Sequence, residues 1–294
     1  MKLTLIKLLA AVCLVLFMGG SSMVEAGRSS TQREVRDLEG IRKIAVEVSS
    51  SRVDVIPTEK ECLEVEYFER TGSADRKPWE LVVEEMGSTV TVRLHDPNVR
   101  TLFNINFGRE SRLTIYVPQQ YYHALSIASS SGSINITDIG LSQLYLQASS
   151  GSIKADYLNV ERSKIGSSSG SITIRGLNSS NALVHSSSGS VSIEDFRGNL
   201  NVRTSSGSSR IEFEEVGNLQ AEASSGNITV ILPWNSEFRV NSSVSSGTYT
   251  NEFPVHITYS SRSNRETSGT VGENPSALID LRTSSGSITV KRSR

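Results

Sequence analysis

The sequence predicts an all-β protein, a single-stranded β-helix (β-solenoid) built from repeats of about 19 residues. Three observations support this. The tripeptide Ser-Ser-Gly recurs along the chain, alternating Ile or Val residues follow most copies, and no helical periodicity separates the copies. About 19 residues in extended conformation suit one turn of a flattened β-helix. A β-sandwich-like double sheet is the alternative.

The glycines of this tripeptide are interpreted as structural turn residues at the corners of successive coils. The first intervals between them are 19, 19, 19, 18 and 19 residues. We expect glycine there because a tight corner favours a residue that tolerates positive φ. Serine is small enough for coils to stack, and its hydroxyl can bond nearby backbone groups. The turn glycines are Gly132, Gly151, Gly170, Gly189, Gly207, Gly226, Gly247 and Gly286.

Two further segments resemble the repeat in part. Ser49-Ser50-Ser51 precedes Val53 and Val55, so it is interpreted as an early copy whose glycine has become Ser51. Thr267-Ser268-Gly269 is interpreted as a degenerate ninth corner. The stack of coils is therefore expected to begin before the regular copies and to continue after them.

Residues 1–26 have the layout of a secretory signal peptide. A positively charged start precedes eleven apolar residues, Leu8–Met18, and small residues follow up to a cleavage site after Ala26. Eleven apolar residues are too few for a bilayer span, which needs about twenty. The sequence thus predicts an exported protein, secreted or at the cell surface. The alternative is an uncleaved segment, residues 3–24, that anchors the chain to the membrane.

The rest of the chain divides by composition and by repeat spacing. Residues 27–40 are polar and are expected to form a flexible lead, and residues 41–292 form one solenoid domain. Within that domain we expect an irregular β part over 41–118, regular repeats over 119–232 and looser repeats over 233–292.

Alternation with a period of two residues predicts the strands of the irregular part. The alternating sets are Ile44, Val46 and Val48; Val53 and Val55; Leu63, Val65 and Tyr67; Leu81 and Val83; Val90, Val92 and Leu94; and Leu113, Ile115 and Val117. An apolar cluster over residues 102–107 is expected to cap the open end of the stack or to form a strand, because exposed apolar surface is rare without a partner.

In the repeats, aliphatic pairs on both sides of each corner are expected to stack on their copies in neighbouring coils. Leu144 and Leu146 before Gly151, and Ile153 after it, are one such set. Residues 259–274 are interpreted as a polar insertion. A final copy at Gly286 predicts that the chain ends on the stack itself.

Charge and cysteine content exclude some functions. The formal net charge is −1, which gives no electrostatic reason to expect nucleic-acid binding. After signal removal Cys62 is the single cysteine, so an internal disulfide is not expected.

The sequence does not predict an enzyme, a metal site or a bound cofactor. Its histidines, His95, His123, His185 and His256, form no metal-binding pair, and no nucleophile elbow or phosphate-binding loop occurs. Catalytic β-helices gather charged residues on one outward face. The candidate outward charges here do not occupy one repeated offset, which favours scattered surface charge: Lys154, Asp156, Arg175, Glu194, Asp195, Arg203 and Arg210.

Two segments resemble a known family. Leu113–Pro118, followed by Leu125 and Ser-Ser-Ser-Gly-Ser-Ile at 129–134, is similar to the DUF4097 putative-adhesin family, as is the closing segment Leu281–Val290. The resemblance covers about residues 41–292. It implies a "toastrack" β-solenoid outside the cytoplasm of a bacterium, with a role in adhesion or in envelope-stress sensing. An exported relative is LiaG of Gram-positive envelope-stress loci, and the family supplies no catalytic residues.

From these observations we expect a non-catalytic, exported cell-envelope protein that acts as an adhesin-like binding module, with a link to the envelope-stress response. Its partner is expected to be a protein or a glycan, and membrane proximity follows if the N-terminal segment stays uncleaved. The alternative is a β-helical enzyme, a lyase or a hydrolase, that acts on polysaccharides.

Overall fold

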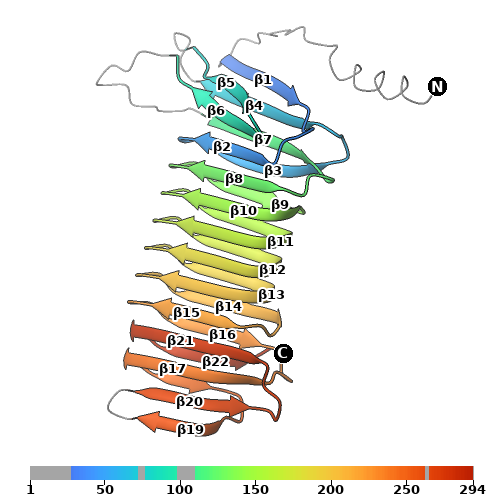
Figure 1. Cartoon of the computed structure of the whole chain (residues 1–294). Helices are drawn as coiled ribbons and strands as arrows, with labels where there is room; N and C mark the ends of the chain where they lie inside the picture. The colour runs from blue at the N-terminus through green and yellow to red at the C-terminus, as the bar shows by residue number, and fades with distance from the viewer. Residues whose placement is uncertain (1–27, 72–76, 98–109, 262–264, 294) are drawn as a thin grey trace, which may run out of the picture.

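The computed structural model describes residues 28–71, 77–97, 110–261 and 265–293, and every regular element among them is a β-strand. In chain order the strands are β1 (Arg28–Arg36), β2 (Lys43–Val48), β3 (Arg52–Thr58), β4 (Leu63–Thr71), β5 (Glu80–Met86), β6 (Thr89–His95), β7 (Glu110–Pro118), β8 (Ala124–Ser129), β9 (Ile134–Thr137), β10 (Gly140–Ala148), β11 (Ile153–Ser167), β12 (Ile172–Ser186), β13 (Val191–Thr204), β14 (Ser209–Glu215), β15 (Leu219–Ala223), β16 (Ile228–Leu232), β17 (Phe238–Ser246), β18 (Tyr249–Asn251), β19 (His256–Ser261), β20 (Glu266–Val271), β21 (Ala277–Ser285) and β22 (Ile288–Arg292). They form one elongated stack, with β1 near one end and β19 at the other (Figure 1).

The stack has two broad faces, which belong to one continuous sheet. On what we call the groove face, the strand order is β1–β4–β7–β3–β9–β11–β12–β13–β14–β16–β22–β18. On the opposite face it is β5–β6–β2–β8–β10–β11–β12–β13–β15–β21–β17–β20–β19. The long strands β11, β12 and β13 bend from one face to the other.

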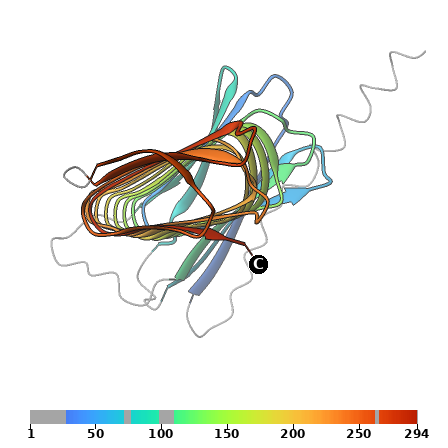
Figure 2. The ribbon, with the colours of Figure 1, turned by 90° about the horizontal axis from the view of Figure 1, so that it is seen from below.

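The predicted β-solenoid is confirmed. Viewed along the stack, the coils superimpose as a flattened ring (Figure 2). Equivalent strands of successive coils pair in parallel, for example β11 with β12 and β12 with β13. A β-sandwich-like double sheet made of meanders would require antiparallel neighbours instead.

The core consists of rows of aliphatic side chains, because copies of the repeat pair in register. Ile134 pairs with Ile153, which pairs with Ile172 and then Val191. Each of the four is at most 1% exposed. Burial of such a side chain contributes roughly 1.5–3 kcal/mol. These rows therefore stabilise the coils at the spacing of paired strands.

The corner glycines allow close approach of the backbone. The prediction that they provide positive φ is wrong for all but one of them. Among the eight, only Gly247 has a positive φ, 151°. A Cβ added to Gly170 would lie 2.0 Å from the carbonyl oxygen of Gly151, and real Cβ atoms essentially never come within 3.0 Å. Successive corners thus touch backbone to backbone, and any larger residue would force the coils apart.

Corner serines satisfy the backbone at these contacts. The N–H of Ser150 donates to the carbonyl of Ser130 in the preceding coil at 2.8 Å. Within one corner, the hydroxyl of Ser186 donates to the carbonyl of Gly189 at 2.7 Å. The ladder begins at Ser51, as the early copy predicts, since a Cβ on Gly132 would lie 1.9 Å from the oxygen of Ser51.

The C-terminal coil ends on the stack, as predicted, but it lies inside the stack. β21 pairs in parallel with β15 on one side and with β17 on the other. In the same way β22 lies between β16 and β18. After Leu232 the chain leaves a gap one coil high and forms β17 and β18 beyond it. It then returns, and β21 and β22 fill the gap. Gly286 accordingly lies between Gly226 and Gly247 in the corner ladder.

One prediction for the last part of the chain is wrong. Thr267-Ser268-Gly269 is not a corner but part of β20, which pairs antiparallel with β17 and with β19. The predicted polar insertion at 259–274 includes the second half of β19 and all of β20, which pair with each other. The side chains of β19 are exposed on both sides except at Ser261, so apolar alternation could not reveal the strand.

The polar segment 27–40 is likewise not a flexible lead. From Arg28 to Arg36 it forms β1, which pairs antiparallel with β4 over nine positions. Polar contacts replace an apolar pattern here: the side chain of Gln32 donates to the carbonyl of Trp79 and accepts the N–H of Leu81 at 2.8 Å. The predicted signal segment and the apolar cluster at 102–107 lie outside the described residues.

At this N-terminal end, β1, β4 and β7 continue the groove face, and the β5–β6 hairpin continues the opposite face. A buried carboxylate joins the outer elements. Glu64, whose side chain is 8% exposed, pairs with Arg33 at 2.5 Å and with Lys60 at 2.6 Å. Although burial alone would raise the pKa of Glu64, these two basic partners lower it below its ordinary value.

Candidate functional site

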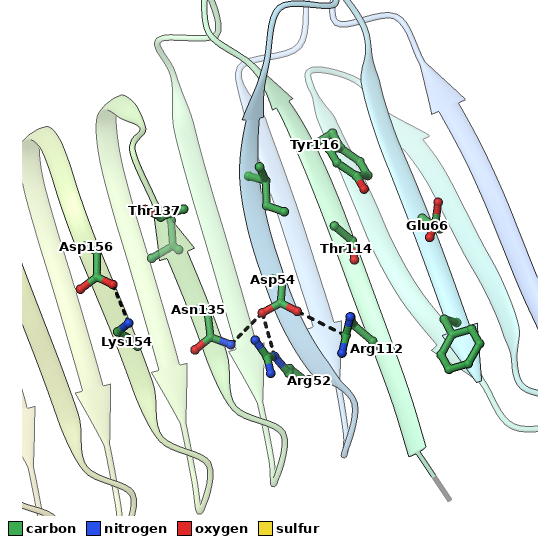
Figure 3. A pocket seen from close by; sticks show the side chains of 13 residues that line it. Arg52, Asp54, Glu66, Arg112, Thr114, Tyr116, Asn135, Thr137, Lys154 and Asp156 are labelled. Carbon is green, nitrogen blue, oxygen red and sulfur yellow. Dashed lines mark hydrogen bonds and ion pairs between the residues drawn. The ribbon is translucent and has the colours of Figure 1, made fainter. Parts of the chain in front are cut away.

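A groove of about 760 Å³ lies on the outside of the groove face. Residues of five neighbouring strands line it, most of them through outward side chains, as Figure 3 shows. The lining residues are Glu66 and Phe68 of β4; Arg112, Thr114 and Tyr116 of β7; Arg52, Asp54 and Ile56 of β3; Asn135, Ile136 and Thr137 of β9; and Lys154 and Asp156 of β11. We call this hollow the Asp54 groove.

Strand register brings these side chains together. Asp54 pairs with Asn135, and Asn135 pairs with Lys154, so one outward row crosses three coils. On the other side of β3, Asp54 pairs with Thr114 of β7. Since alternate residues of a strand face the same way, two side chains from most of the strands point into the groove.

Asp54 is the centre of the polar contacts. One of its carboxylate oxygens, Oδ1, accepts Arg52 Nε and Asn135 Nδ2, both at 2.8 Å, and Arg112 Nε lies 3.6 Å from Oδ2 (Figure 3). The side chain of Asp54 is 15% exposed. Three partners from three strands fix this carboxylate, which positions the side chains around it.

Two other carboxylates in the groove have unused acceptor oxygens. Asp156 pairs through Oδ2 with Lys154 at 2.9 Å, but its buried Oδ1 accepts no hydrogen bond. The carboxylate of Glu66 makes no hydrogen bond or ion pair with any described residue. Buried acceptors are normally satisfied, so the Oδ1 of Asp156 is a natural contact point for a donor from outside the chain, and the half-buried carboxylate of Glu66 can accept a second one.

The groove also has apolar surface. Phe68 and Tyr116 are half-buried, and Ile56 is exposed. Ligand sites typically combine such surface with a few placed polar groups. The groove therefore has the chemical make-up of a binding site for an amphipathic or hydroxyl-rich ligand.

The outward charges singled out in the sequence do not all occupy one offset, but three of them do share one. Asp156 pairs with Arg175 and Arg175 with Glu194, so the three lie in one row of alternating charge. Arg175 lies 3.3 Å from Glu194. Such rows stabilise the stack, and only Lys154 and Asp156 reach the groove.

The remaining charges of that set lie elsewhere. Arg203 is on the opposite face, 3.5 Å from Glu222. Arg210 pairs with Glu212 on β14, and Asp195 has a positive φ of 54° at a bend of β13. None of these three residues lines the Asp54 groove.

Sequence reasoning missed Asp54, Glu66 and Arg112. A signal for Asp54 existed, because it follows Ser51 by the same three residues that separate Asn135 from Gly132 and Lys154 from Gly151. Glu66 and Arg112 belong to strands without a Ser-Ser-Gly corner, and the repeat gives no information about them.

A second hollow of about 530 Å³ lies on the opposite face, and five of its thirteen lining residues are Asn or Gln. Asn218 Nδ2 donates to Asn199 Oδ1 at 3.0 Å, and Asn199 Nδ2 donates to the carbonyl of Ser180 at 3.0 Å. The N–H of Leu278 donates to Asn218 Oδ1 at 2.9 Å. These amides already bond to neighbouring coils, so the Asp54 groove is the stronger candidate.

Within the described ranges, no group of three or more His, Cys, Asp and Glu side chains is placed to hold a metal ion. Cys62 lies half-buried between β3 and β4. In the part of the chain that the structure describes, no helix is long and apolar enough to cross a membrane.

A family model described as Toastrack DUF4097 matches residues 41–291. The solved structure of a putative adhesin from Bacteroides fragilis is 13% identical, with 89% of this chain and 97% of that chain covered and a TM-score of 0.50. A putative adhesin from Parabacteroides merdae is 13% identical, with 91% and 97% covered and a TM-score of 0.45.

A putative lipid binding protein from Parabacteroides distasonis is 14% identical, with 90% of this chain and 98% of that chain covered and a TM-score of 0.46. At these identities, likeness to solved structures shows the fold alone. Among curated proteins, none matches this chain significantly.

Proposed function

Since the chain belongs to the Toastrack DUF4097 family, we propose that it is a non-catalytic, adhesin-like binding module that is exported to the cell envelope. The observation that carries this proposal is the Asp54 groove, a preformed hollow on a long, rigid β-solenoid. Binding sites on rigid scaffolds lose little entropy when they engage a partner.

The arrangement of the groove favours binding over catalysis. Asp54 is engaged by three partners, and Asp156 by Lys154, so neither carboxylate is an isolated acid or base. Glu66 is the remaining carboxylate of the groove, and hydrolysis of a glycosidic bond uses a pair of carboxyl groups rather than one. A polysaccharide lyase or hydrolase remains the alternative, and turnover of polymers by the purified chain would establish it.

Export is proposed from residues 1–26, whose charged start and apolar stretch are typical of a signal peptide. The mature chain would then begin at Gly27, and residues 41–292 would form the solenoid domain. Intact-mass measurement of the chain from the producing cell tests this. A mass that includes residues 1–26 would instead favour an anchor.

The binding role is tested by incubating the purified chain with separate wall and membrane fractions. Retention on wall polysaccharide supports the adhesin-like role. Recovery of a membrane signalling protein would instead support a link to the envelope-stress response. Retention on neither fraction would contradict the proposed function.

A further inference from the structure

We propose that the Asp54 groove binds an uncharged, extended oligosaccharide that lies along the axis of the stack. The inference rests on the proposed binding function and names its ligand. Four properties of the groove carry it: its charge balance, its free acceptors, its apolar surface and its length.

Charge balance argues against an ionic ligand. Three basic and three acidic side chains line the groove, and all of them except Glu66 are held in ion pairs with one another. An anion such as a phosphate or sulfate would meet arginine charges that Asp54 already balances, and it would also meet the unpaired carboxylate of Glu66. An uncharged ligand leaves the pairs intact.

Hydrogen-bonding groups in the groove match hydroxyl groups. Glu66 and the buried Oδ1 of Asp156 need donors, whereas the half-exposed guanidinium groups of Arg52 and Arg112 can donate. Asn135 gives its NH₂ group to Asp54, so its carbonyl oxygen can accept. A hydroxyl both donates and accepts, and neighbouring hydroxyls on one sugar ring can serve both kinds of partner.

The apolar groups suit the C–H faces of sugar rings. Phe68 and Tyr116, on adjacent strands, line the same groove as these polar groups. Aromatic side chains with an apolar ring face, and in tyrosine a polar tip, serve ligands that are apolar on one side and wet on the other.

The groove is longer than one sugar ring. Glu66 on β4 and Asp156 on β11 are separated by β7, β3 and β9. Four strand spacings correspond to about 19 Å along the stack axis. Because contact points occur at both ends, an oligosaccharide of several units fits better than a monosaccharide.

Calorimetric titration of the mature chain tests the inference. The panel consists of three uncharged hexasaccharides, namely cellohexaose, maltohexaose and N-acetylchitohexaose, with hexagalacturonate and a heparin hexasaccharide as acidic probes. We expect at least one uncharged hexasaccharide to bind, and its disaccharide to bind more weakly. Phe68→Ala and Glu66→Ala should each weaken binding by about tenfold or more.

Tyr145→Ala is the matched control, because Tyr145 is an outward, 36% exposed aromatic residue on the opposite face. Its binding should equal that of the unaltered chain. The inference is overturned if none of the uncharged hexasaccharides binds, if only the acidic probes bind, or if both groove variants bind like Tyr145→Ala. Retention on wall material that persists in the groove variants would leave the proposed function standing and the inference wrong.

Discussion

Replacing Gly170 by alanine tests how the coils are held together. The added Cβ would lie 2.0 Å from the carbonyl oxygen of Gly151 and 2.5 Å from its carbonyl carbon. Both atoms belong to the backbone of the neighbouring coil, so neither can rotate away. The contact can reach the 3.0 Å limit of real Cβ atoms only if the two corners separate by about 1 Å.

That separation would break the hydrogen bonds beside the corner. The N–H of Ser169 donates to Ser149 at 2.9 Å, and the N–H of Ile153 donates to Ser171 at 3.0 Å. An increase of about 1 Å exceeds hydrogen-bonding distance. Each lost bond costs about 0.5–1.5 kcal/mol, and overpacking adds about 1–3 kcal/mol. We expect Gly170→Ala to lower the free energy of unfolding by about 2–5 kcal/mol.

Urea unfolding followed by circular dichroism measures this difference, and the chain offers graded controls. A Cβ on Gly140 would meet nothing closer than Asn159 O at 3.9 Å, so Gly140→Ala should stay within about 0.5 kcal/mol. A Cβ on Gly166 would meet the flexible end of Gln147 at 2.5 Å. The loss of unfolding free energy in Gly166→Ala should therefore lie between those of Gly140→Ala and Gly170→Ala. If Gly170→Ala and Gly140→Ala have the same free energy of unfolding, close backbone approach does not explain why glycine occupies the corners.

Three further predictions concern stability. The ion pairs of Glu64 lower its pKa below the ordinary 4.5. The stability that they contribute is therefore present above about pH 4.5 and is lost as the pH falls through the lowered pKa. As the pH is lowered from about 7 to about 3, the urea midpoint should fall less steeply in Glu64→Gln than in the unaltered chain. Deletion of residues 277–294 should also unfold residues 233–276, because the deleted coil lies between that segment and the rest of the stack. Protease resistance of residues 233–276 in the shortened chain would refute this insertion. Ile165→Ala should cost about 2–4 kcal/mol in urea unfolding, because Ile165 is fully buried, and a loss below about 1 kcal/mol would contradict its place in the core.

The sequence predicted the coil because the repeat joins a corner to an alternating core pair. Even the altered copy at Ser51 could be placed, since Val53 and Val55 keep their offsets from it. The order of stacking could not be predicted in the same way. Ile288 fits between Ile228 and Tyr249 in the register, but nothing in its own spacing distinguishes this position from the end of the stack.

Elements without apolar alternation were missed for a related reason. β1 and β19 are held by backbone pairing and polar contacts, which leave little trace in a hydrophobic pattern. The groove was partly predictable: Asp54 could be aligned with Lys154 through the repeat, whereas Arg112 enters from β7, which has no corner motif.

Co-sedimentation with envelope glycans purified from the producing cell tests the binding account most directly. The amount of chain in the pellet would be compared between the unaltered protein, a Phe68→Ala/Glu66→Ala double variant and Tyr145→Ala. The account predicts that the unaltered chain and Tyr145→Ala sediment with the glycans and that the double variant stays in solution. A double variant that sediments like the unaltered chain, or an unaltered chain that does not sediment, would contradict it.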